Sequence, residues 1–196
     1  MKKFISIATC FTLLFCESKD FYKTPTFSLN NNLNAVIEIP AGTNKKIEYN
    51  FEKEVFEVDK KNGKERVIDF LPYLGNYGYV PSTYSDPLKG GDGDALDILV
   101  LSESVSTGTI IEVIPIAMLK LIDEDELDYK IIAIPVEIEN RIININSFTD
   151  LKRNYREVMQ IIELWFLNYN KEDKAEIKGW ADKQEALKEI NNNLKT

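Results

Sequence analysis

The sequence contains no histidine, the side chain that most often serves as a general base near neutral pH. Catalytic triads of the Ser-His-Asp type and most zinc sites need histidine, so both are excluded. Cysteine is also scarce, because its two copies are Cys10 and Cys16 and none follows them. The rest of the chain therefore offers neither a disulfide framework nor a cysteine nucleophile.

An excess of positive charge is missing as well. The chain has 24 Lys and Arg against 32 Asp and Glu, which gives a formal net charge of −8. Nucleic acid is excluded as a partner, because its binding needs basic surfaces that neutralise phosphates. The 196 residues are 44% hydrophobic and 29% charged, which are globular values. They predict one domain with a well-formed core and some additional length.

Residues 1–16 are typical of an export signal. A pair of lysines precedes an apolar run that ends at Phe15 and is too short to cross a membrane. The letters LLFC at the end of this run resemble a bacterial lipobox, in which Cys16 carries a lipid, although Phe15 is bulky for that motif. The pattern predicts an exported protein of a bacterial cell envelope that meets the membrane only through this anchor. The alternative is a cytoplasmic protein with an unusual N-terminal strand or helix.

The middle of the chain is rich in short β-type runs. Residues 17–34 are polar with scattered aromatics, and predict a tether or an N-terminal arm before a domain over residues 35–196. Asn62 and Gly63 are typical of a hairpin turn. The expected strands cover residues 35–40, 47–53, 54–60, 95–101, 109–123 and 129–137.

The last third of the chain changes to a helical period. Ser147 begins a sequence like a capping box, and apolar residues then recur at steps of four and three from Leu151 to Tyr169. A second helix is expected near Asp182, with Glu185 three residues further on. Short strands followed by two main C-terminal helices predict a β-rich α+β fold, in which the helices flank a closed or nearly closed antiparallel barrel.

Three aspartates stand directly before one of the buried strands. Asp92 and Asp94 alternate around Gly93 and point the same way in an extended chain, while Asp97 begins the strand, where an unpaired charge is costly. Two carboxylates repel by roughly 4 kcal/mol at close range in a partly screened environment, so either solvent or a cation must compensate. A solvated turn is the alternative, because Asp and Gly are ordinary turn formers.

Other carboxylates also occur at strand positions or strand ends. Asp123 and Asp128 belong to an acidic group between two β-type runs, where a solvated hairpin is the alternative for several members. Glu38 and Glu48 each interrupt a β-patterned run. Oxygen ligands without histidine or cysteine suit a hard cation, Mg²⁺ before Ca²⁺ or Zn²⁺.

Basic and phenolic residues lie near these carboxylates in the sequence. Lys46 stands beside Glu48, Arg66 follows the expected hairpin, and the segment NYGYVP carries tyrosines. Arg and Lys are the usual partners of phosphate, and a tyrosine hydroxyl can donate to a phosphate oxygen. Each has a plainer interpretation alone, such as a pairing of Arg66 with Asp69. Jointly they predict a site for a small, highly charged phosphate compound.

The segment DGDALDI, from Asp92 to Ile98, matches a family signature of the form Asp–small–Asp–X–hydrophobic–Asp–hydrophobic. The segments VIEIP, KIE, NYGYVP, LIDEDELDYKIIAIP, NY and KGW accompany it in the family's order. The chain thus resembles the family I soluble inorganic pyrophosphatases over nearly all of residues 35–190. The resemblance implies a five-stranded OB-like barrel, several Mg²⁺ ions per site, and hydrolysis of inorganic diphosphate to two orthophosphates by a metal-activated water.

The resemblance also implies a role for each matching position. Asp94 would activate the attacking water, Glu38 and Glu48 would shape an acidic shell, and bacterial relatives suggest a homo-oligomer. The implied metal ligands are Asp92, Asp97, Asp123 and Asp128, and the implied phosphate contacts are Lys46, Arg66, Tyr77, Lys130 and Tyr169.

The chain departs from the family pattern at the end of the long helix. The family's Tyr–Lys pair is Tyr169–Asn170 here, with Lys171 one step later, either reaching the phosphate or solvated. Two other functions stay open. One is a non-catalytic envelope module that binds a divalent cation, such as Ca²⁺, through the same acidic loops. The other is a nucleotide phosphohydrolase, which is disfavoured because no aromatic or Gly-rich base pocket is evident.

Overall fold

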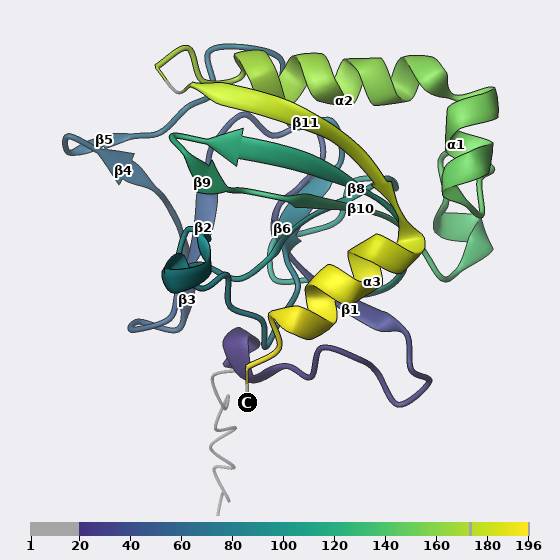
Figure 1. The fold of residues 1–196 in the computed structure, drawn as a ribbon. Helices are drawn as coiled ribbons and strands as arrows, with labels where there is room; N and C mark the ends of the chain where they lie inside the picture. The colour runs from purple at the N-terminus through teal and green to yellow at the C-terminus, as the bar shows by residue number, and fades with distance from the viewer. Residues whose placement is uncertain (1–19, 173, 196) are drawn as a thin grey trace, which may run out of the picture.

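The computed structural model describes residues 20–172 and 174–195, and the predictions for an export signal and a lipobox in residues 1–16 lie outside them. Strands dominate the first two thirds, and the α-helices come late in the chain (Figure 1). The strands are β1 (Leu33–Ile39), β2 (Ile47–Asn50), β3 (Val55–Val58), β4 (Lys60–Lys61), β5 (Lys64–Glu65), β6 (Asn76–Tyr79), β7 (Asp97–Val100), β8 (Ile110–Asp123), β9 (Glu126–Leu127), β10 (Lys130–Pro135) and β11 (Ala175–Asp182). The helices are α1 (Phe148–Asn154), α2 (Arg156–Asn168) and α3 (Lys183–Asn192), with short 3-10 turns η1 (Phe21–Lys23), η2 (Pro87–Lys89) and η3 (Ile138–Asn140).

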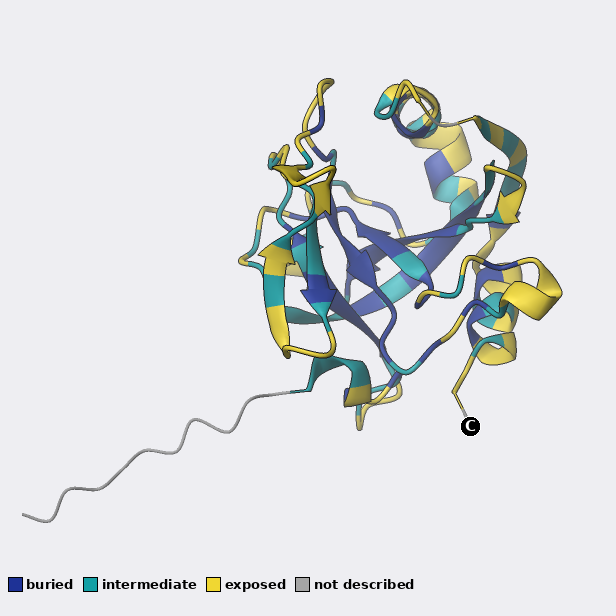
Figure 2. Ribbon diagram, turned by 90° about the vertical axis from the view of Figure 1, so that its left-hand side faces the viewer, coloured by how far each residue is buried: buried dark blue, intermediate teal, exposed yellow. Residues whose placement is uncertain are grey.

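The main sheet is mixed. Its strands pair in the order β1-β6-β7-β10-β8-β11, and β1 also pairs with β8, so that five strands form a closed series of pairings. Figure 2 shows these strands as the buried centre of the molecule. β7 and β10 run parallel, whereas the other strand pairs in the described residues are antiparallel. The expectation of an antiparallel barrel is therefore wrong for this pair. The chain reverses after β8, so that the following strand β10 runs antiparallel to β8 and parallel to β7.

Alternate residues of β10 serve two different cores, because successive side chains of a strand point to opposite faces. Ile132 packs in a cluster that includes Trp165 of α2, and Ile131 packs in a second cluster with Ile190 of α3. Every residue of β10 is buried as a result. A strand covered on both faces has a continuous apolar sequence instead of an alternating one.

The long C-terminal helix predicted from Ser147 to Tyr169 is two helices. The backbone leaves the helical region at Tyr155, with φ −142° and ψ 41°, between α1 and α2. Leu151 of α1 and Ile162 of α2 pack in the same core cluster, so the apolar period continues through the bend and does not reveal it. Counted over the described residues, there are three α-helices where two were expected. None of the helices in those residues is long and apolar enough to span a membrane.

Two strands longer than two residues were not predicted, β6 and β11. The residues of β6 are all buried, and its Gly78 is required by packing, since a Cβ there would lie 1.9 Å from the carbonyl oxygen of Val36. β11 is an outer strand that pairs with β8, and its register shifts between Ile177 and Gly179, where Gly179 has φ +119°. Its alternation of charged and apolar residues is too short and too interrupted to identify a strand by itself.

The hairpin at Asn62–Gly63 is confirmed. Asn62 and Gly63 have φ of 55° and 77°, and they join β4 to β5. Positive φ at both central positions is the requirement of a two-residue turn of this kind. The preceding pair β2–β3 is shorter than predicted, because a turn occupies residues 51–54.

Residues 20–32, called the N-terminal arm below, lie against the domain. The Thr26 hydroxyl donates to the carbonyl oxygen of Pro81 at 2.8 Å, and the Ser82 hydroxyl donates to the carbonyl oxygen of Thr24 at 2.9 Å. Phe21 of η1 packs on Phe56 of β3, with ring centroids 4.9 Å apart. The arm therefore reaches the β2–β3 hairpin.

We expect Asp182→Ala to lower the free energy of unfolding by about 1 kcal/mol. Asp182 caps α3, because its side chain accepts from the backbone N–H groups of Gln184 at 2.9 Å and Glu185 at 3.1 Å. Urea denaturation measures the change, and Lys183→Ala on the same exposed turn is the matched control. Equal stability of the two variants would contradict a capping role.

Candidate active site

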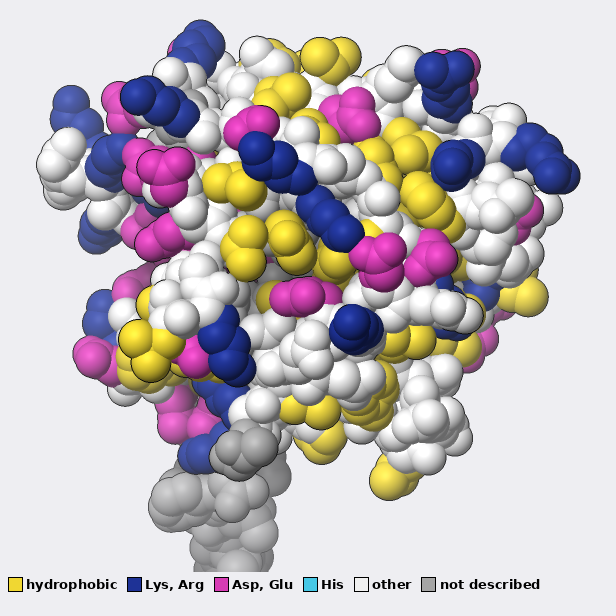
Figure 3. Space-filling view, viewed as in Figure 1, with side chains coloured by type: hydrophobic (Ala, Val, Ile, Leu, Met, Phe, Trp, Pro, Cys, Tyr) yellow, Lys and Arg dark blue, Asp and Glu magenta, His cyan; other side chains and the backbone are white. Residues whose placement is uncertain are grey.

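The predicted site residues all line one cleft of about 680 Å³. The cleft lies between the β2–β3 hairpin, the first residues of β7 and β10, and the end of α2. Charged side chains of both signs crowd the side of the molecule that carries β2 to β5 (Figure 3). The residues brought together are Glu38, Lys46, Glu48, Arg66, Tyr77, Asp92, Asp94, Asp97, Asp123, Asp128, Lys130 and Tyr169.

The parallel pairing of β7 and β10 builds the centre of this cleft. Asp97 and Lys130 are the first residues of their strands and stand opposite each other in the register. Tyr77 lies on β6, which pairs with β7 on its other side. Three neighbouring strands thus present a carboxylate, an ammonium and a phenol at the cleft.

Lys130 is a buried cation held by two carboxylates. Its Nζ donates to Asp97 Oδ2 at 2.5 Å and to Asp128 Oδ1, and only 4% of its side chain is exposed. The Tyr77 hydroxyl donates to the same Asp97 oxygen at 2.5 Å. Although burial opposes the charge on Lys130, the neighbouring Asp128 and Asp97 raise its pKa above the ordinary value. Tyr77 and Lys130, predicted as phosphate contacts, are therefore both bound to Asp97.

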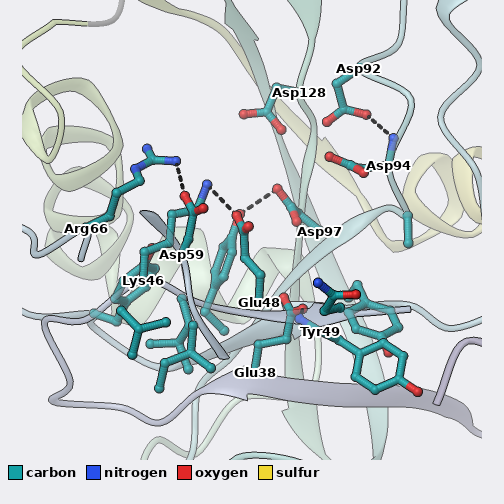
Figure 4. Close-up of a pocket in the computed structure, with 18 of the residues that line it drawn as sticks. Glu38, Lys46, Glu48, Tyr49, Asp59, Arg66, Asp92, Asp94, Asp97 and Asp128 are labelled. Carbon is teal, nitrogen blue, oxygen red and sulfur yellow. Dashed lines mark hydrogen bonds and ion pairs between the residues drawn. The ribbon is translucent and has the colours of Figure 1, made fainter. Parts of the chain in front are cut away.

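The remaining aspartates carry an excess of negative charge. Burial raises the pKa of Asp94, and the charges of Asp92 and Asp97 raise it further. Burial likewise raises the pKa of Asp128 to about 6, even though Lys130 lowers it. Figure 4 shows Asp92, Asp94 and Asp128 pointing into the same space. A cation that enters the cleft would stabilise the ionised form of these carboxylates and lower their pKa.

Glu38, one of the two residues of the predicted acidic shell, has a raised pKa. Burial raises its pKa to about 8, against the hydrogen bond that the Tyr49 N–H donates to its Oε1 at 2.7 Å. Glu48, on β2, instead forms an ion pair with Lys46, whose Nζ lies 2.8 Å from Glu48 Oε1. The two predicted shell residues thus differ: Glu38 is largely protonated at pH 7, and Glu48 is ion-paired with Lys46.

Asp59 lines the basic side of the cleft and was not among the predicted site residues. Arg66 donates from its guanidinium to Asp59 Oδ2 at 2.8 Å, so the suggested pairing with Asp69 is wrong (Figure 4). Burial alone would raise the pKa of Asp59, but the hydrogen bond from Arg66 lowers it below the ordinary value. A signal was available, because a two-residue turn at Asn62–Gly63 places Asp59 opposite Arg66 in the hairpin.

Lys171 does not contribute to the cleft. Its Nζ lies 3.9 Å from Asp69 Oδ2 at the surface, and 75% of its side chain is exposed. Tyr169 does line the cleft, with its ring stacked on Trp165 at 4.7 Å between centroids. Of the two alternatives for Lys171, the solvated one describes this structure.

An aromatic wall was also missed. Tyr22 of the N-terminal arm lines the cleft together with Tyr49, Phe51 and Tyr79. Burial, and then the charges of Asp94 and Glu38, raise the pKa of Tyr22 to about 12. Nothing in the sequence connects Tyr22 to residues so far along the chain.

The donor chemistry of the cleft fits a hard divalent cation. Its carboxylates offer only oxygen donors. Burial, and then the charges of Asp92 and Asp97, raise the pKa of Asp94, whereas a bound cation would lower it. Within residues 20–172 and 174–195, no three carboxylates converge as a preformed metal site. The Lys130 ammonium stands between Asp97 and Asp128 instead.

Comparison with known proteins identifies the family. The family model described as inorganic pyrophosphatase matches residues 35–196. The inorganic pyrophosphatase of Neisseria meningitidis serogroup B is 34% identical over 166 residues, which cover 83% of this chain and 86% of that protein. That of Saccharolobus solfataricus is 35% identical over 166 residues, which cover 82% and 88%. The crystal structure of inorganic pyrophosphatase from Thermus thermophilus superposes with a TM-score of 0.76 at 28% identity, covering 90% of this chain and 97% of that one.

The chain therefore belongs to the inorganic pyrophosphatase family, and the resemblance stated from its sequence is confirmed. The β-rich fold with late helices agrees with the solved relatives.

Proposed function

We propose that this protein hydrolyses inorganic diphosphate to two orthophosphates with Mg²⁺ as its cofactor. The observation that carries the proposal is the division of the cleft, in which Asp92, Asp94 and Asp97 face the cations Lys46 and Arg66 (Figure 4). A compact anion bound by metal ions on one side and by basic side chains on the other suits that arrangement.

Substrate binding is assigned to the basic side. Lys46 and Arg66 present an ammonium and a guanidinium, each already oriented by one carboxylate, to the phosphate oxygens. Tyr169 would add a hydroxyl from the end of α2. Tyr77 and Lys130 are retained as phosphate contacts with a second role, because both now orient Asp97.

The metal side is assigned to Asp92, Asp97, Asp123 and Asp128. Mg²⁺ bound there would neutralise phosphate charge and lower the pKa of a water from ~15.7 toward neutrality. Glu38 and Glu48 complete the acidic shell around these ligands.

Asp94 is assigned as the general base. Its pKa is raised by burial and by Asp92, which makes the carboxylate a better proton acceptor. The water oxygen forms a bond to one phosphorus while the bond from that phosphorus to the bridging oxygen breaks. Asp94 takes the proton that the water loses. The cations Lys46 and Arg66 stabilise the phosphate that leaves.

A single assay tests the proposal. Phosphate release from diphosphate is measured with and without Mg²⁺, and with ATP as the comparison substrate. Release from diphosphate that requires Mg²⁺ supports the proposal, and equal or faster release from ATP would favour a nucleotide phosphohydrolase. Binding of a divalent cation without any release would favour the non-catalytic cation-binding module.

We expect Lys171→Ala to leave KM and kcat for diphosphate within about twofold of the wild type, the scatter expected for an exposed residue. Its ammonium lies beside Asp69 and outside the cleft. Steady-state kinetics measure both constants, and Lys178→Ala at another exposed ion pair is the control. A rise in KM for Lys171→Ala alone would show that this lysine reaches the substrate.

Three further proposals concern the whole molecule. The closed series of five strand pairings supports an OB-like barrel. The sequence of residues 1–16 supports export and a lipid on Cys16, which the mass of the mature N-terminus in fractionated cells tests. A homo-oligomer rests on the family alone, and sedimentation measures it.

A further inference from the structure

The β2–β3 hairpin depends on aromatic packing for its place beside the domain. Within the described residues its two strands form a sheet of their own and pair with no strand of the main sheet. A two-stranded hairpin alone is marginally stable in water, so it needs other contacts. Tyr49 and Phe56 stand opposite each other in its register, with ring centroids 4.9 Å apart. This aromatic pair is the face that the hairpin offers for packing.

Phe21 of η1 lies between that face and the domain. Its ring meets the Phe56 ring edge-on at 4.9 Å and the Tyr49 ring edge-on at 5.5 Å, measured between centroids. Its N–H donates to the Tyr49 hydroxyl at 3.4 Å. On the domain side is Gly108, before β8, where a Cβ would stand 3.5 Å from the Phe21 ring and 3.2 Å from the Phe56 ring. Phe21 therefore touches the hairpin and the domain together.

The other face of the hairpin belongs to the cleft. Successive side chains of a strand point to opposite faces, so Glu48 points away from the face that carries Tyr49. Glu48 Oε1 lies 2.8 Å from Lys46 Nζ, and both residues line the cleft (Figure 4). The backbone of Lys46 is fixed from another side, because its N–H donates to the Arg66 carbonyl at 3.0 Å. What the hairpin controls is therefore the direction of the Lys46 ammonium, through Glu48.

We propose that Phe21 is a positioning residue, whose ring holds the β2–β3 hairpin on the domain and thereby keeps Glu48 where it orients the Lys46 ammonium for phosphate. The inference rests on the proposed function for the identity of the substrate. Phe21 precedes the residues that the family model matches, so this support comes from the N-terminal arm. Such support matters for activity, because a misplacement of about 1 Å in a site can lower a rate by roughly 10²-fold.

The first test measures kcat/KM for diphosphate in the full-length protein with Mg²⁺. Phe21→Ala is expected to lower it at least about tenfold, within the range for a displaced group. Phe27→Ala is the matched control, because Phe27 belongs to the same arm but packs in the cluster that contains Ile190. That variant is expected to stay within about twofold of the wild type. Equal values of kcat/KM in the two variants overturn the proposal.

A second test asks whether the loss runs through Lys46. In a Lys46→Ala background the ammonium to be oriented is absent, and residues that act together are not additive. Adding Phe21→Ala there is expected to lower kcat/KM by less than about twofold. A further loss as large as in the wild type would show general damage to the fold and overturns the proposal. The unfolding midpoint of each variant is recorded, and Phe21→Leu replaces Phe21→Ala under the same criteria if the alanine variant does not fold.

Amide hydrogen exchange tests the packing without turnover. Phe21→Ala is expected to speed exchange in residues 47–58 at least about tenfold relative to Phe27→Ala, because a local unit that loses its packing opens more often. Equal exchange in the two variants overturns the inference, whether or not the protein hydrolyses diphosphate. Failure of the wild type to release phosphate from diphosphate counts instead against the proposed function.

Discussion

Asp97→Asn is expected to leave a folded protein whose kcat for diphosphate is lower by roughly 10²–10³-fold, the usual loss on removing one charged group that acts in the transition state. The amide preserves the volume of the side chain at the start of β7. It carries no negative charge, however, so it binds a divalent cation poorly and holds the Lys130 ammonium less strongly. Since Asp97 Oδ2 accepts from both Tyr77 and Lys130, one substitution disturbs three members of the site.

Asp125→Asn is the matched control. Asp125 lies in the exposed turn between β8 and β9, with φ 72°, a conformation that asparagine tolerates well. The same chemical change there is expected to leave kcat within about twofold, as for surface substitutions generally. Steady-state phosphate release measures both variants, and circular dichroism checks the fold. Comparable losses in the two variants would mean that the acidic cleft is misassigned.

Lys130→Met is expected to lower the free energy of unfolding by about 3–5 kcal/mol, the cost of leaving buried charges without their partner. Methionine fills a similar volume, so the loss reports charge more than packing. Only 4% of the Lys130 side chain is exposed, and Asp97 and Asp128 both depend on it. Denaturation in urea, with EDTA present, measures the loss. Lys120→Met breaks the more exposed ion pair with Glu185 and is expected to cost at most about 1 kcal/mol.

The loss in Lys130→Met should also depend on pH. Lys130 lowers the pKa of Asp128, which nevertheless lies at about 6 in the folded protein against 3.8 ordinarily, so the variant shifts it further upward. The folded variant then binds a proton that the unfolded chain releases, and its stability falls as pH rises through that range. The deficit is therefore expected to be smaller at pH 5 than at pH 8. A deficit that is constant between these values would show that packing, and not charge, is responsible.

The chemistry of the site could be predicted because much of it is local. Asp92, Asp94 and Asp97 are close in sequence, so their crowding before a strand is visible without any fold. Asp59 could have been found in the same way, since a two-residue turn fixes which residue faces Arg66. The apolar period likewise predicted α3 and its cap at Asp182, because capping depends only on the next few residues.

Other features depended on contacts between distant segments. The bend at Tyr155 left no trace in the apolar period, because both helices pack on the same cluster. β6 has four residues and the alternation of β11 is interrupted at Gly179, so neither could be recognised alone, and both exist because partner strands supply their hydrogen bonds. A pattern within one segment records which face is buried, and it does not record which element buries it.

The sequence by itself therefore determined the types of group in the site: oxygen ligands, a few cations, and neither imidazole nor thiol. Tertiary structure alone decided that Lys130 stands between Asp97 and Asp128, and that Tyr22 lines the cleft. The physical reason is that residue type sets which bonds a side chain can form. The parallel pairing of β7 with β10 and the docking of the N-terminal arm set which partners come within reach.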